Sequence, residues 1–182
     1  MTCIVGIKTT DNVYIGGDTF GSNGHTGESY LRPKVFKKGN MIIGVCGSYR
    51  LMQILEFCLE LPKKYEGIST EKYLYIDFIN AVRTTLKANG LLAVDKGVES
   101  MDGGIFLMGY EGELYKVQQD LSILMPASGY ASVGSGCDHA KASLFSTEGL
   151  LLDPKERIVK AIECANNFVV SVNGENNIIS LI

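Results

Sequence analysis

The sequence predicts an α+β protein in which two antiparallel sheets pack face to face and a helix pair covers each outer side. Strand-like and helix-like segments come in runs: strands, two helices, strands, two helices and one last strand. Such runs, without strict alternation, are typical of α+β layers. This arrangement also buries the apolar stripe of every helix. The chain has 182 residues, 46% apolar and 20% charged, and is expected to form one domain over residues 1–182.

The N-terminal part of the chain favours strands. Four segments before residue 48 are apolar and rich in residues that favour strands: residues 2–8, 13–18, 35–38 and 41–46. Asp11-Asn12 and Gly39-Asn40 are typical turn sequences and join these segments in pairs. Residues 21–27 are expected to form a loop. We therefore expect four strands in antiparallel order, followed by a helix.

Two helices are predicted next. Ser48 is a suitable N-cap for the first, which has apolar residues at helical spacing as far as Cys58 and ends at Pro62. The second starts near residues 69–71 and runs to about residue 89. Its apolar stripe includes Tyr75, Phe78, Ile79 and Val82.

The second half repeats this order. Strands are predicted at residues 104–109, 114–117 and 130–133, with a turn at residues 110–113 between the first two. A helix that includes residues 140–145 follows Gly134-Ser135-Gly136. Asp153 as N-cap and Pro154 at the first helical position begin another helix, which runs to about residue 168. Residues 178–181 form the predicted last strand.

Composition excludes several function classes. A net charge of −3 argues against nucleic-acid binding, which favours a basic face. No apolar run approaches the length of a membrane span, and the N-terminus does not resemble a secretory signal. The five cysteines are scattered, which favours buried thiols in a reducing cytoplasm over a disulfide framework. Two distant histidines supply neither a zinc site nor a serine–histidine triad, so we expect no metal or organic cofactor.

Thr2 is the first candidate for chemistry. It directly follows Met1, and removal of a methionine that precedes a small residue leaves threonine with a free α-amine. Threonine is a weak nucleophile that needs a base beside it, and an α-amine can be that base. The reference pKa of this amine is about 7.7–8.0, so it is partly unprotonated near neutral pH.

Thr2 stands in a series of motifs that together resemble one family. They are Thr2-Cys-Ile-Val-Gly-Ile7, Ile15-Gly-Gly-Asp18, Lys34, Ile43-Gly-Val-Cys-Gly47 and Val133-Gly-Ser-Gly136. With this spacing the chain resembles proteasome β-type subunits, and more closely the peptidase subunit of the bacterial two-component ATP-dependent protease. These are threonine peptidases among the N-terminal-nucleophile hydrolases. The resemblance covers almost the whole chain and implies their four-layer αββα sandwich.

The resemblance implies a role for each motif residue. Thr2 Oγ would attack a peptide carbonyl while its own α-amine takes the proton. Lys34 would be the buried cation beside Thr2, and Asp18 would hold that lysine charged and aimed. The Gly47 N–H would be an oxyanion donor, and Ser135 would hydrogen-bond the terminal amine.

The same resemblance implies how a substrate binds. Unfolded polypeptide would lie extended against Ser22 and the sheet edge at Gly47. The pocket for the side chain before the scissile bond would draw on Gly21, Arg32, Phe36, Val45 and Tyr49. Homo-oligomeric stacked rings and an ATP-dependent unfoldase partner are also implied.

One stretch departs from the family pattern. Active members carry an aspartate near the end of the last long helix and a serine shortly after it. The better alignment places Asn167 and Val170 at these positions, and a shift by one residue places Phe168 and Ser171 there. Either way the carboxylate is missing. Two alternatives to a peptidase therefore stay open: a catalytically inactive, ring-forming homologue and a small-molecule amidase of the same superfamily.

Overall fold

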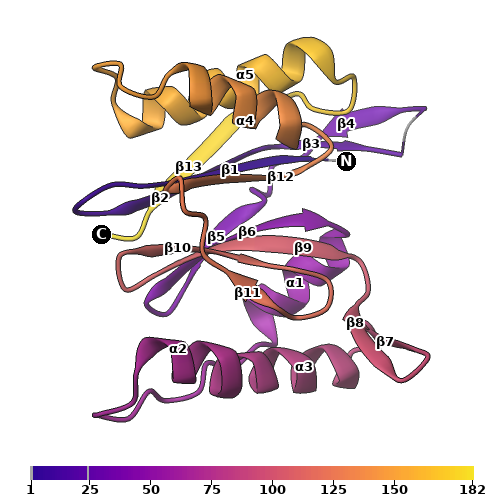
Figure 1. The fold of residues 1–182 in the computed structure, drawn as a ribbon. Coiled ribbons are helices and arrows are strands. Elements are labelled where there is room, and N and C mark those ends of the chain that lie inside the picture. The colour runs from indigo at the N-terminus through magenta and orange to yellow at the C-terminus, as the bar shows by residue number, and fades with distance from the viewer. Residues whose placement is uncertain (1, 24) are drawn as a thin grey trace.

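Two sheets lie face to face between two outer layers of helices in the computed structural model, which describes residues 2–23 and 25–182 (Figure 1). The first sheet has the order β12-β1-β2-β13 and the second the order β11-β10-β9-β6-β5. Neighbouring strands are antiparallel throughout both sheets. The expected loss of Met1 concerns a residue outside the described ones.

The strands of the first sheet are β1 (Cys3–Lys8), β2 (Val13–Asp18), β12 (Tyr130–Gly134) and β13 (Asn176–Ser180). Those of the second are β5 (Val35–Lys38), β6 (Met41–Gly47), β9 (Gly104–Tyr110), β10 (Glu113–Val117) and β11 (Ile123–Leu124). The four strands predicted before residue 48 thus divide between the sheets, with β1 and β2 in one and β5 and β6 in the other.

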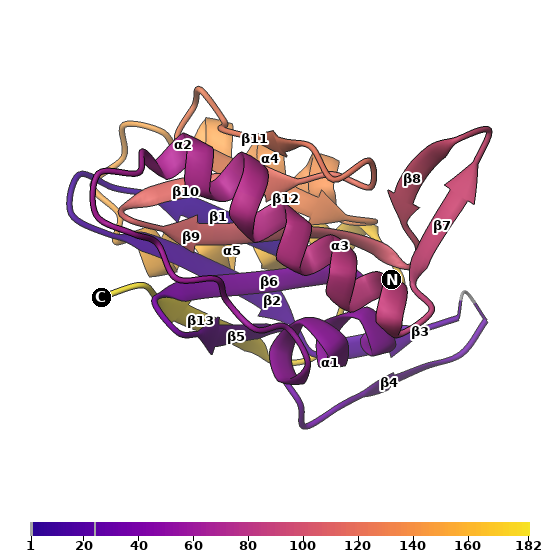
Figure 2. The ribbon, with the colours of Figure 1, turned by 90° about the horizontal axis from the view of Figure 1, so that it is seen from below.

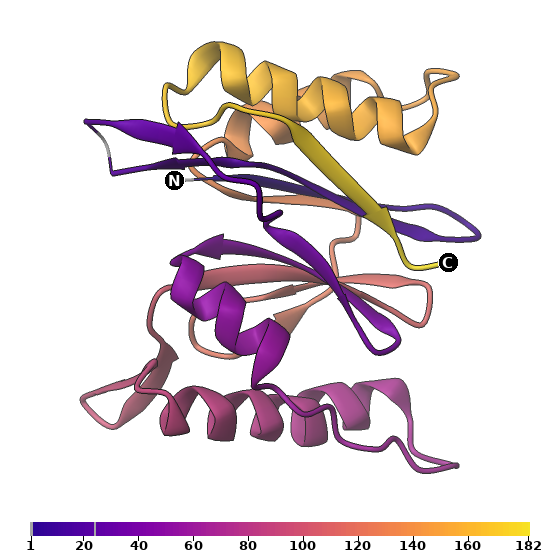
Figure 3. The same ribbon diagram turned by 180° about the vertical axis from the view of Figure 1, so that it is seen from behind.

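Helices α4 (Cys137–Ser146) and α5 (Pro154–Phe168) cover the first sheet. A capping box between Asp153 and Glu156 begins α5, with Pro154 in the first turn. Helices α1 (Tyr49–Phe57), α2 (Thr70–Lys72) and α3 (Ile79–Ala88) lie over the second sheet (Figures 2 and 3). Ser48 caps α1 by accepting the Leu51 N–H at 3.0 Å.

The core has three parts, one for each interface between layers. Cys3, Ile158 and Ile162 belong to the part between the first sheet and its helices. Ile4, Ile15 and Ile42 belong to the part between the sheets. The third part packs the second sheet against α1 and α3. Three filled interfaces make the molecule the predicted αββα sandwich.

Three local features differ from the prediction. Residues 21–27 are not simply a loop, because β3 (Phe20–Ser22) pairs with β4 (Gly27–Ser29) in a hairpin. A second hairpin, β7 (Leu92–Asp95) with β8 (Val98–Met101), projects beside α3 (Figure 2). Between α2 and α3 the chain is π-helical over Tyr73–Phe78. This wider turn shifts the register, so Tyr73 is buried and Tyr75 is exposed.

Candidate active site

Thr2 lies at the entrance to β1 and is 2% exposed. Its backbone nitrogen donates to Ser135 Oγ at 3.3 Å, and its carbonyl accepts the Gly136 N–H at 3.4 Å. Ser135 follows β12, which pairs with β1. Gly134 has φ +106°, and a Cβ there would lie 2.0 Å from the Thr2 carbonyl oxygen. Glycine is therefore required for the turn to approach Thr2 so closely.

Asp18 ends β2, and the pairing of Ile4 with Gly17 brings it beside Cys3. The Asp18 carboxylate accepts the Cys3 N–H at 2.8 Å and the Phe20 N–H at 3.2 Å. Asp18 is fully buried. Burial raises the pKa of its carboxyl, while Lys34 and the two N–H donors oppose that rise.

Lys34 is the cation paired with Asp18. Its Nζ lies 2.8 Å from Asp18 Oδ2 and donates to the Phe20 carbonyl at 2.5 Å. Lys34 is 3% exposed. Burial lowers the pKa of its ammonium, and the Asp18 carboxylate opposes that change. The structure thus brings Thr2, Asp18, Lys34 and Ser135 together.

Gly47 ends β6 and lines an open cleft of about 1060 Å³ together with Gly134 and Ser135. Its φ is +130°, and a Cβ there would lie 1.8 Å from the Gly103 carbonyl oxygen. The backbone thus needs glycine at this position. Gly47 ends a strand of the second sheet and Gly134 ends a strand of the first, so the cleft opens between the sheets, next to the Gly134–Ser135 segment that contacts Thr2.

Ser171 is the residue that the structure places at the site. It is 1% exposed, and its Oγ lies 3.1 Å from Ser135 Oγ. Val170 is instead 92% exposed. The exposed Asn167 donates to the Glu163 carbonyl of its own helix at 3.0 Å. The serine of the shifted alignment, Ser171, therefore lies at the site, whereas Asn167 and Val170 point to solvent.

Ser135 is not the N-cap of the helix that follows it. A serine at the start of a helix is commonly its N-cap, but the N-cap of α4 is Gly136. The Ser135 hydroxyl is instead engaged with Thr2 and Ser171. It links the N-terminal strand to the segment after α5.

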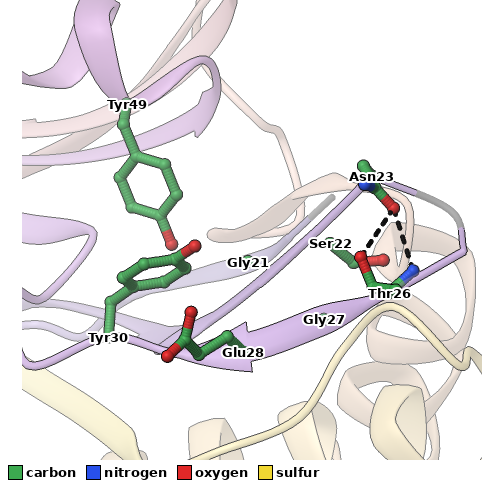
Figure 4. Close-up of a pocket in the computed structure, with 8 residues that line it drawn as sticks. All are labelled: Gly21, Ser22, Asn23, Thr26, Gly27, Glu28, Tyr30 and Tyr49. Atoms are coloured by element: carbon green, nitrogen blue, oxygen red, sulfur yellow. Dashed lines mark hydrogen bonds between the residues drawn. The ribbon is translucent and has the colours of Figure 1, made fainter.

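A second pocket, of about 580 Å³, lies between the β3–β4 hairpin and Tyr49 (Figure 4). Gly21, Ser22 and Tyr49, three of the predicted substrate-binding residues, line it. Tyr30 also lines it and makes an edge-on contact with Tyr49, at 5.2 Å between ring centroids. The Tyr49 hydroxyl is buried and finds no hydrogen-bond partner among the described residues. The sequence does not predict Tyr30 at this pocket because it directly follows β4, and the sequence pattern of the β3–β4 hairpin is too weak to indicate strands.

Arg32, Phe36 and Val45 do not line this second pocket. Arg32 pairs with Glu56 at 2.7 Å and lies over the Phe57 ring, so it faces α1. Phe36 and Val45 are buried in the core between the second sheet and its helices. The predicted pocket is thus divided: two of its side chains are core residues, and Arg32 belongs to another surface.

Neighbouring thiols do not offer a better nucleophile. Burial raises the pKa of Cys3 to about 12, and it also raises the pKa of Cys46. Both side chains are therefore neutral thiols near pH 7, whereas the thiolate is the reactive form. Within residues 2–23 and 25–182, no three His, Cys, Asp or Glu side chains gather as a metal site would require.

The αββα sandwich is shared with several solved structures. The solved structure of Thiobacillus denitrificans BPH superposes on this chain with a TM-score of 0.82. The two sequences are 17% identical, and the match covers 98% of this chain and 97% of that one. The same protein in complex with epoxomicin gives 0.82 at 15% identity, with coverage of 98% and 97%. Eukaryotic HslV from Trypanosoma brucei gives 0.69 at 18% identity, with 98% of each chain covered.

These likenesses confirm the predicted proteasome-like fold. No family model matches the chain, and no curated protein sequence matches it. None of the helices in the described residues has the length and apolar character needed to cross a membrane.

Proposed function

We propose that the chain is a threonine-type endopeptidase subunit whose nucleophile is Thr2 after removal of Met1. One observation carries the proposal: the residue that follows Thr2 is anchored to a buried ion pair. Asp18 accepts the Cys3 N–H at 2.8 Å and holds Lys34 at 2.8 Å. From the other side, Ser135 Oγ accepts a hydrogen bond from the Thr2 nitrogen at 3.3 Å. A nucleophile held this way has its attack geometry set in advance.

The chemistry proceeds by acyl transfer. Thr2 Oγ bonds to the substrate carbonyl carbon while the α-amine of Thr2 takes the hydroxyl proton. The carbonyl becomes an oxyanion, for which the Gly47 N–H is the proposed donor. The C–N bond then breaks, and the proton passes from the α-amine to the leaving amine. Water hydrolyses the resulting ester and frees Thr2.

The Lys34 charge favours this cycle in two ways. A nearby cation favours loss of the hydroxyl proton, and it also disfavours protonation of the α-amine. Asp18 keeps that charge in place, since a lysine this buried would otherwise lose its proton more easily. Ser135, positioned by Ser171 at 3.1 Å, orients the amine. In this proposal Ser171 is a positioning residue.

Substrates are proposed to be unfolded polypeptides. An extended chain would lie against β3 at Ser22 and pass Thr2, with one side chain in the pocket formed by Gly21, Tyr30 and Tyr49. We further propose assembly into homo-oligomeric stacked rings, an ATP-dependent unfoldase as partner, and a cytoplasmic location. Five free cysteines in the described residues suit a reducing compartment.

One observation favours a second candidate, an inactive ring-forming homologue. The end of α5 carries Asn167 and Phe168, exposed to solvent, and no carboxylate there reaches Ser135 in the described part of the chain. The two candidates differ in a simple measurement. Untagged protein should hydrolyse fluorogenic peptides, and Thr2→Ala should abolish turnover while Thr2→Ser retains part of it. Turnover that is absent from wild-type protein with a free Thr2, or that survives Thr2→Ala, would overturn the peptidase proposal.

A further inference from the structure

The cleft beside Gly47 and Ser135 continues away from Thr2 and carries two lysines. Lys116 and Lys141 both line it. They also line an adjoining hollow of about 320 Å³ that contains Tyr130 and Leu124. Gly47 and Ser135 belong to the first cavity alone. The lysines therefore stand at the junction of the two cavities, along a groove that starts at the candidate nucleophile.

Neither lysine is neutralised by a near neighbour. Within residues 2–23 and 25–182, the ion pairs involve other side chains, and neither Lys116 nor Lys141 takes part in one. Asp120 also lines the cleft, but its Oδ1 accepts the Ser122 hydroxyl at 2.6 Å and the Ser122 N–H at 3.0 Å. Asp120 is thus already hydrogen-bonded, and a second carboxylate, Asp138, accepts a hydrogen bond from the thiol of the cleft residue Cys137 at 3.4 Å.

The ammonium groups of Lys116 and Lys141 both act electrostatically on Cys137, which lines the cleft. The pKa of Cys137 is raised first by burial and then by Asp138, and Lys141 and Lys116 each oppose that rise. Cys137 is the first residue of α4, whose helix dipole adds partial positive charge to the same wall. These features together make this part of the groove attractive to an anion.

We propose that Lys116 and Lys141 form a subsite for an acidic side chain of the polypeptide substrate, a specificity that rests on the proposed peptidase function. The sheet register gives its distance from the scissile bond. Gly47 pairs with Gly104, and Lys116 is opposite Leu107, three residues further along β9. Three strand residues span about 10 Å along the sheet, and β6 and β10 flank β9, which adds about 9.5 Å across it, so Gly47 and Lys116 are roughly 14 Å apart. An extended substrate places its fourth residue from the scissile bond at that distance.

The subsite lies on the flank of Thr2 opposite Tyr49. In the first sheet β1 stands between β12, which borders the groove, and β2, which leads to the β3–β4 hairpin. An extended chain that crosses Thr2 can therefore use both. The pocket at Tyr30 and Tyr49 would bind one substrate side chain, and the lysine subsite would bind a carboxylate.

Binding to the full-length Thr2→Ala variant tests the subsite without cleavage. Fluorescein-labelled peptides that differ only by Glu, Gln or Lys at each of the four positions on either side of a fixed central bond are measured by anisotropy. We expect Glu at one position about four residues from that bond to bind roughly tenfold more tightly than Gln. Lys116→Gln and Lys141→Gln should each reduce this preference about threefold, as partly exposed charge pairs do. The matched control Lys160→Gln, an exposed lysine on α5 outside the cleft, should leave it unchanged.

The outcomes separate this inference from the proposed function. Equal affinities for Glu and Gln peptides, a preference that survives both substitutions, or an absence of binding up to millimolar peptide would overturn the subsite. Hydrolysis of a neutral peptide by wild-type protein tests the peptidase independently. A Glu preference in binding without any hydrolysis would keep the subsite and remove the enzyme. Salt should weaken the preference, since the Debye length falls from about 10 Å at 0.1 M to 3 Å at 1 M.

Discussion

The Lys34 ammonium lies 2.8 Å from the Asp18 carboxylate, and both side chains are almost completely buried. Asp18 in turn accepts the N–H of Cys3, the residue directly after Thr2. The pair therefore has two roles. It fixes the start of β1, and it carries a positive charge that the proposed chemistry needs.

Breaking this pair should destabilise the fold strongly. Asp18→Asn or Lys34→Met leaves one buried charge without its partner, which commonly costs about 3–5 kcal/mol of unfolding free energy. Urea unfolding of each variant and of the double variant measures this. The double variant should lose less than the sum of the two single changes, because no unpaired charge remains. Glu56→Gln, which breaks the partly exposed pair with Arg32, should change stability by no more than about 1 kcal/mol. Strictly additive losses would show that Asp18 and Lys34 are not coupled.

Ser171 should matter for turnover and Val170 should not. Ser171→Ala removes the hydroxyl that lies 3.1 Å from Ser135 Oγ, so the amine of Thr2 loses part of its positioning. We expect kcat to fall about tenfold with KM little changed, and the pH profile of kcat/KM to shift. Ser171→Thr should restore part of the rate by supplying a hydroxyl again. Val170→Ala is the matched control, since Val170 is exposed. An unchanged pH profile in Ser171→Ala would argue against the positioning role.

Asn167→Asp should leave activity unchanged. The Asn167 side chain is exposed and bonds to the Glu163 carbonyl, so a carboxylate there would not reach Thr2. Peptide turnover by this variant tests whether the Asn167 side chain lies away from Thr2, as the structure places it. A large gain in rate would restore the first alignment and contradict the placement of Asn167 in the structure.

Gly47→Ala should impair both fold and activity. The φ of +130° is strained for any side chain, and the new Cβ would lie 1.8 Å from the Gly103 carbonyl oxygen. Gly67 provides a control with positive φ, +81°, but with no atom within 4 Å of an added Cβ. Thermal unfolding should show a clearly larger loss for Gly47→Ala than for Gly67→Ala. Similar losses would mean that backbone conformation, without the contact, explains the glycine.

The buried hydroxyl groups of three tyrosines predict that the protein unfolds at alkaline pH. Burial raises the pKa of Tyr49, Tyr110 and Tyr115 to about 12, from an ordinary value near 10. The unfolded chain therefore loses these protons first. Their contribution to stability is fully present below pH 10 and is lost as the pH rises through 12. Tyrosinate absorbance and far-UV circular dichroism should change together in that interval for these three residues. Their ionisation well below pH 11 with the fold intact would contradict their burial.

The sequence predicts most of the sandwich because its segments have strong local signals. The capping box at Asp153 and the turn at Gly39-Asn40 are examples. Thr2, Asp18, Lys34 and Ser135 are singled out by their motifs, and each stands at the end of a strand or directly beside one. Tyr75 is misplaced since a π-helical turn shifts the register of the stripe, and no local pattern marks such a turn.

The remaining errors depend on long-range contacts. Arg32 pairs with Glu56, 24 positions away in the chain, and spacing alone does not reveal that choice. Whether Val170 or Ser171 faces the site depends on how α5 ends, where the C-cap Val169 is extended. The groove with Lys116 and Lys141 joins β10 to α4, so only the assembled sheets show it.

Intact mass and peptide mapping after treatment with a peptide epoxyketone test the central claim most directly. The ketone and epoxide carbons of this reagent can bond to the hydroxyl and the α-amine of one N-terminal threonine. For untagged protein made in cells, the account predicts a chain that lacks one methionine and carries one inhibitor, with the adduct on Thr2. It also predicts no adduct in Thr2→Ala. A chain that keeps Met1 throughout, or an adduct on any other residue, would contradict the account.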